Sequence, residues 1–151
     1  MRRATELLAA SLLAAGCHAP APVVARAGAI EISNPYAFAP VVGDEGSAYF
    51  TLKNGGTTAD TLTGISAGSA MAMLHDSRMD GSVVRMVRLD VLPLAAGALD
   101  SLAPGQKHLM LTGLDPAPHP GDTLRLHLTF AHAGSVDLAV PVFRYGERPG
   151  Q

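Results

Sequence analysis

Short runs in which apolar and polar residues alternate recur along the chain from residue 29 onward. Alternation with a period of two is typical of strands that bury one face, and it is clear in TLRLHLTF at 123–130. Clusters rich in Gly, Pro, Asp and Asn separate the runs, as expected for turns. The pattern predicts eight strands, at 29–33, 47–53, 61–65, 71–75, 83–91, 108–114, 123–130 and 136–142.

This succession of short strands, without a convincing amphipathic helix, predicts an all-β domain with a Greek-key β-sandwich or barrel. There is no internal repeat and no sign of a second domain. We expect four parts: an export signal at 1–16, an Ala/Pro-rich tether at 17–28, the sandwich at 29–145 and a short polar tail at 146–151.

The first residues have the layout of an export signal, because Arg2 and Arg3 precede a short apolar run at 7–15. The only cysteine, Cys17, follows in Ala-Ala-Gly-Cys, which resembles a bacterial lipobox although Leu13 falls one place too early. This predicts cleavage before Cys17 and a lipid on its thiol, hence a periplasmic protein held at a membrane. Two alternatives are a soluble periplasmic protein cut after Ala27, and a free thiol at Cys17.

The amino-acid composition limits the kinds of molecule that this protein is expected to bind. The 151 residues are 48% hydrophobic and 16% charged, with a formal net charge of −2, which suits one globular domain. There is no run of Lys or Arg, so we expect no nucleic acid partner. No apolar stretch reaches 18 residues, so we expect contact with a membrane only through the lipid.

Two histidines and two methionines occur at spacings that favour a shared site. Asp80-Gly81 is a two-residue hairpin signal, and counting outward from it pairs His75 with Met86 on one face. His108 and Met110 are two residues apart in an alternating segment, so they also share a face. The sequence predicts a metal site formed by His75, Met86, His108 and Met110.

The donor types indicate the ion. Thioether sulfur is soft and uncharged, and together with imidazole it suits Cu(I) better than Mg²⁺ or Ca²⁺. Zinc prefers thiolate, carboxylate or more imidazole, and no cysteine is present beyond Cys17. We therefore expect Cu(I) as the bound ion.

The pattern His-x10-Met-x21-His-x-Met resembles that of the PCuAC family of periplasmic copper chaperones. GSAYFTLKNGG, LAPGQKHLMLTGL and GDTLRLHLTFAHAGSVDLAVPV are also similar to segments of that family, and the resemblance runs from about residue 30 to 142. It implies a cupredoxin-like or immunoglobulin-like β-sandwich and a role in assembly of the binuclear copper centre of cytochrome c oxidase. PYAF replaces a common Ala-Trp pair, and the His- and Met-rich tail of some members is missing.

The leading hypothesis is a Cu(I) carrier that passes its ion to an acceptor, either cytochrome c oxidase subunit II or a thiol-bearing assembly factor. We do not expect an enzyme, because no Ser-His-Asp or paired-carboxylate arrangement is apparent. A blue-copper site would need a Cys thiolate. The alternative is a metal-free envelope lipoprotein whose sandwich binds other proteins.

The remaining donors have simpler expected roles. Met71 and Met73 share the parity of His75, and we expect them to pack beneath the site. Met79 is expected at the hairpin tip without a role. Asp76 either orients an imidazole or begins the turn. The other histidines are expected to be structural or solvent-facing: His119, His127 and His132.

Overall fold

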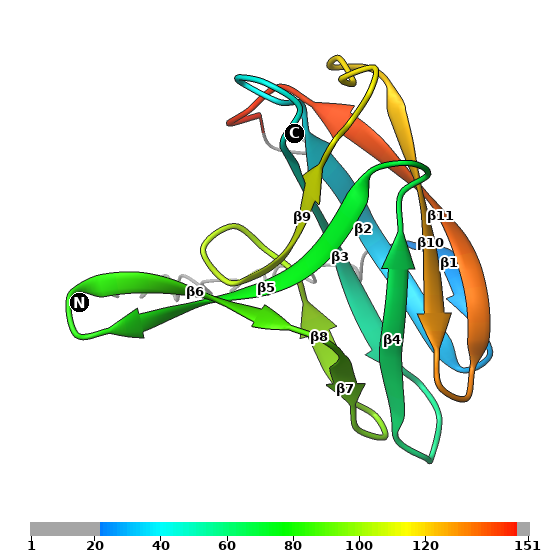
Figure 1. The fold of residues 1–151 in the computed structure, drawn as a ribbon. Helices are drawn as coiled ribbons and strands as arrows, with labels where there is room; N and C mark the ends of the chain where they lie inside the picture. The colour runs from blue at the N-terminus through cyan, green and yellow to red at the C-terminus, as the bar shows by residue number, and fades with distance from the viewer. Residues whose placement is uncertain (1–21, 148–151) are drawn as a thin grey trace, which may run out of the picture.

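The computed structural model describes residues 22–147, in which eleven strands occur and no helix is long and apolar enough to cross a membrane. The predicted signal peptide, Cys17 and residues 148–151 of the predicted tail lie outside this range. Figure 1 shows the strands: β1 Val23–Ala27, β2 Ile30–Phe38, β3 Gly46–Asn54, β4 Asp60–Ser66, β5 Met71–Asp80, β6 Val83–Leu89, β7 Leu92–Leu94, β8 Leu99–Ser101, β9 Lys107–Thr112, β10 Thr123–Phe130 and β11 Gly134–Phe143.

The strands form two layers that a short parallel contact joins. Hydrogen bonding gives the order β6-β5-β9-β3-β2-β11-β10-β4-β7, with β1 added to β2 and β8 added to β3. β2 and β11 pair in parallel over only two residue pairs. The chain crosses between the layers after β3, β4, β6, β7 and β9, so neighbours in sequence are often not neighbours in the sheet. The predicted all-β sandwich is confirmed.

The core lies between the layers. Alternate residues of β10 and β11 point inward, as the period of two requires, and Leu128 and Val140 are fully buried. In β9, Leu109 and Leu111 are also fully buried. The other face of β9 therefore presents His108 and Met110 away from the core.

Several strands differ from the predicted ones. Residues 23–27, expected in the tether, pair as β1 with β2. β2 continues past residue 33 to Phe38 across a register shift, where Asn34 has a φ of 51°. β7 and β8 were not predicted, because three residues are too few to show a period. The predicted strand at 83–91 ends at Leu89, and residues 92–94 cross to the other layer to pair with β4.

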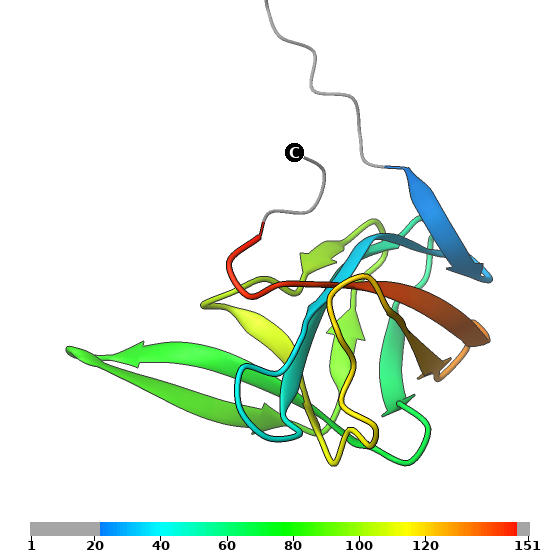
Figure 2. The same cartoon turned by 90° about the horizontal axis from the view of Figure 1, so that it is seen from above.

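The β5–β6 hairpin extends beyond the body of the sandwich, as both views show (Figures 1 and 2). Its turn is Gly81-Ser82, because Asp80 pairs with Val83. Gly81 has a φ of 63° whereas Ser82 has no positive φ, which matches a type II′ turn with glycine first. The predicted Asp80-Gly81 turn is therefore wrong, and every pairing across the hairpin moves by two residues.

Candidate metal centre

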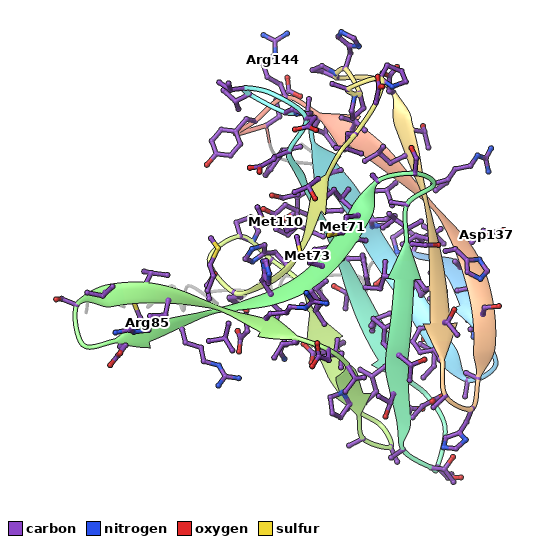
Figure 3. All side chains as sticks on the ribbon, viewed as in Figure 1. Met71, Met73, Arg85, Met110, Asp137 and Arg144 are labelled. Atoms are coloured by element: carbon purple, nitrogen blue, oxygen red, sulfur yellow. The ribbon has the colours of Figure 1, made fainter. Side chains whose placement is uncertain are left out.

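The pairing of β5 with β9 brings two of the predicted donors together directly. His75 lies opposite His108, and the next pair on the same face is Met73 opposite Met110. Opposed residues of an antiparallel pair have Cβ atoms roughly 5 Å apart. Two imidazoles and two thioethers therefore lie on one face of two adjacent strands. Figure 3 labels the two methionines, Met73 and Met110.

Met86 reaches the same face from β6, although not as its sequence neighbours suggested. It pairs with Ser77, and His75 pairs with Arg88, so Met86 is diagonal to His75 rather than beside it. A shift of two residues leaves the face unchanged. A hollow at this place is lined by Met86, His108 and Met110 together with residues 45–47. The structure thus brings all four predicted residues to one face.

The two imidazoles are close enough to share one ion. Their ring centroids are 5.8 Å apart and the rings are inclined at 74°. A metal about 2 Å from a ring nitrogen lies about 3 Å from that ring's centroid, so two rings on one metal have centroids no more than about 6 Å apart. His75 and His108 meet this condition.

The orientation of His108 is set by the main chain. Its Nδ1 lies 3.0 Å from the carbonyl oxygen of Gln106, which also accepts a hydrogen bond of 3.3 Å from the Ser77 N–H. A carbonyl accepts only, so Nδ1 of His108 carries the proton and Nε2 keeps a free lone pair. A main-chain carbonyl is a common partner of this kind for metal-binding histidines.

The environment of the His75 ring differs from that of His108. Its Nδ1 is buried without a hydrogen-bond partner. Burial lowers the pKa of His75 below its usual value, and the neighbouring His108 and Arg88 push the pKa in the same direction. The neutral form, which is the one that binds metals, is therefore favoured. Asp76 does not orient this ring, because Nδ1 of His75 has no hydrogen-bond partner and the Asp76 carboxylate forms an ion pair with Arg78 at 2.8 Å. Asp76 also does not begin the hairpin turn, which is Gly81-Ser82.

The other histidines, which were expected to be structural or solvent-facing, lie away from this face. Nδ1 of His127 is 2.7 Å from the Asp137 carboxylate on the exposed face of β10 and β11. His119 lies exposed in a loop, and the backbone N–H of His132 donates to the buried Asp60 carboxylate.

Within residues 22–147, no three His, Cys, Asp or Glu side chains are grouped so as to hold a metal. A metal held by His75 and His108 would therefore need donors of another kind, and the thioethers on the same face supply them.

Two features of the site were missed by sequence reasoning. Met73 was assigned to packing, although its parity already placed it on the face of His75; what was missing was the strand opposite it. The Gln106 carbonyl leaves no signal in the sequence, because any residue at that position carries one.

The fold is that of a small β-sandwich domain similar to solved PCuAC domains. The copper-bound PCuAC domain from PmoF2 is 23% identical and superimposes with a TM-score of 0.69, covering 80% of this chain and 97% of that one. The Cu(I) form of DR1885 from Deinococcus radiodurans is 25% identical, with a TM-score of 0.59 over 87% of this chain and 85% of that one. The predicted resemblance to the PCuAC family is confirmed at the level of fold.

The chain belongs to the LpqE-like family, whose model, described as "Putative lipoprotein LpqE-like", matches residues 30–142. A curated relative, "Putative lipoprotein Lxx21020" from Leifsonia xyli subsp. xyli, is 27% identical over 94% of this chain and 93% of its own length. Both descriptions agree with the lipoprotein expected from the sequence.

Proposed function

We propose that this domain carries one Cu(I) ion on His75, Met86, His108 and Met110 and transfers it to a partner protein in the cell envelope. The observation that supports this most directly is the convergence of these residues. Three of them line one hollow, and the fourth, His75, faces His108 across the β5–β9 ladder.

The chemistry of the donors favours Cu(I) over other ions. All four side chains are uncharged when His75 and His108 are neutral, and a soft set of imidazole and thioether stabilises the reduced ion. The lowered pKa of His75 favours the neutral form of that imidazole. The buried, unpartnered Nδ1 of His75 is a polar atom whose burial a metal would compensate.

The relatives support a copper role without defining the partner. Two of the structural neighbours are a copper-bound PCuAC domain and the Cu(I) form of DR1885. The domain thus resembles carriers of copper rather than enzymes, and we infer no reaction catalysed by it.

Transfer from such a site is an exchange of ligands without a change of oxidation state. The Cu(I) ion leaves neutral donors one at a time as donors of the acceptor replace them, and thiolates of an acceptor would bind it more strongly than thioethers. We propose the copper centre of cytochrome c oxidase subunit II, or a thiol-bearing assembly factor, as the acceptor. An export signal at 1–16 and a lipid on Cys17 would place the carrier in the periplasm, at a membrane.

The experiment is anaerobic loading of the mature protein with Cu(I), followed by X-ray absorption at the copper edge and competition with a chromogenic Cu(I) chelator. We expect one ion per chain with both nitrogen and sulfur donors. His75→Ala and His108→Ala should weaken binding while the apo domain still folds, and His127→Ala is the matched control on an exposed strand face. Wild-type protein that binds no Cu(I) would favour the metal-free protein-binding lipoprotein instead.

A further inference from the structure

Five of the six methionines lie in the described part of the chain, and all five occupy one face of the sheet formed by β6, β5 and β9. In β5 the odd-numbered positions share the face of His75. Register then places Met86 on this face through its partner Ser77, and Met110 through its partner Met73. The five are Met71, Met73, Met79, Met86 and Met110. Figure 3 shows Met71, Met73 and Met110 gathered where β5 passes β9.

Met73 is not a core residue. The buried cluster and the partly buried residues packed against it include its neighbours Ala72 and Leu74, but neither Met73 nor Met110. Both methionines are half-buried on the opposite side of the sheet. Packing of the core therefore does not account for a thioether at position 73.

By strand register alone, Met73 is at least as near to the imidazoles as Met86, although Met86 and not Met73 lines the hollow beside His108 and Met110. Met73 is one same-face step from His75 and directly opposite Met110, and such a step spans about 7 Å along a strand. Met86 is one same-face step from the residue opposite His75, so it lies on the diagonal. His75, His108, Met110 and Met73 thus form a compact set on two strands, with no contribution from β6.

We propose that Met73 is a further Cu(I) donor, so that the ion has two overlapping donor sets that share His75, His108 and Met110. Met86 completes one set from the hairpin, and Met73 completes the other from the body of the sandwich. This inference rests on the proposed function of the same site and adds to it a mechanism for release.

Met86 and Met73 differ in exposure, and we expect them to act at different stages of copper transfer. The side chain of Met86 is 65% exposed, and it lies just beyond the last β5–β9 pair, Asp76 with Lys107. Met73 is half-buried within the paired part of β5. An acceptor that approaches along the hairpin meets Met86 first, and when Met86 is displaced Met73 keeps the ion attached. The ion stays Cu(I) throughout, and each step replaces one neutral donor by another.

The test uses the Cu(I)-loaded full domain and volume-conserving Met→Leu changes. Met86→Leu alone should retain two sulfur donors in X-ray absorption and lose little affinity, because Met73 substitutes for Met86. Met73→Leu alone should also lose little. Met73→Leu/Met86→Leu should retain one sulfur and lose at least about tenfold more affinity than the product of the single losses. Met71→Leu, on the same strand and face but 61% exposed and opposite Thr112, is the matched control and should change nothing.

The outcomes separate the two proposals. A single sulfur donor in Met86→Leu overturns the role of Met73, and because this variant leaves Met73 unchanged, the result does not depend on how a substitution at Met73 affects folding. A double variant that binds Cu(I) no more weakly than Met86→Leu also overturns the role of Met73. Wild-type protein that fails to bind Cu(I) overturns the proposed function itself.

Discussion

His75 lies directly opposite His108 on the neighbouring strand, with 5.8 Å between their ring centroids. This proximity has an electrostatic consequence as well as a chemical one. Burial, and to a lesser extent the neighbouring His108 and Arg88, hold the pKa of His75 below its ordinary value of 6.5. The folded apo domain therefore resists protonation of His75 more than the unfolded chain does.

The first prediction is a pH dependence of apo stability. Because the folded-state pKa of His75 is the lower one, the unfolded chain binds more protons as the pH falls through 6.5, and the free energy of unfolding falls with it. His75→Gln should lose less stability between pH 7 and pH 5 than the wild type does. Chemical denaturation at both pH values measures the difference. His119→Gln, at an exposed loop position, is the control, and an equal loss in wild type and His75→Gln would contradict the prediction.

The second prediction separates ligand from packing at Met110. Met110→Leu conserves volume and should cost under about 1.5 kcal/mol of apo stability. It should nevertheless weaken Cu(I) binding severely, because Met110 belongs to both donor sets. Thermal unfolding and chelator competition give the two readings. Met79→Leu, on the same sheet face but 68% exposed on the hairpin, should leave copper binding unchanged. Wild-type affinity in a Met86→Leu/Met110→Leu double variant would remove the main argument for the site.

The third prediction concerns the hairpin turn. Gly81 has a φ of 63°, and although no atom would obstruct an added Cβ, an L side chain in this region costs roughly 1–2 kcal/mol. Gly81→Ala should therefore speed amide hydrogen exchange in residues 77–86, with the core strands still protected. Ser82→Ala is the matched control. Hairpin amides that exchange as slowly in Gly81→Ala as in the wild type would refute the assigned turn.

The fourth prediction concerns location and rests on Cys17, which lies outside the described residues. If Cys17 carries a lipid, the mature protein should partition into detergent. Cys17→Ser should release it into the soluble periplasmic fraction with its Cu(I) affinity unchanged, because β5, β6 and β9 do not include this residue. Fractionation and N-terminal sequencing are the measurements. Soluble wild-type protein beginning at Gly28 would exclude the lipid anchor but not the copper site.

The sequence by itself determined the fold class, the kind of donor and the face on which each donor lies. A strand has a period of two, so the parity of His75, His108 and Met110 could be read locally, as could the buried alternation of β10 and β11. Even the wrong turn left Met86 on the correct face, because the error was an even number of residues.

Only the tertiary structure decided which strands are neighbours and in what register. The pairing of β5 with β9 joins segments more than thirty residues apart in sequence, and packing of the core selects it rather than any local signal. That pairing places Met73 opposite Met110 and brings the Ser77 N–H to the Gln106 carbonyl. The turn register depended on a backbone angle at Gly81, since Asp-Gly and Gly-Ser are both acceptable hairpin turns and differ in the φ values that they require.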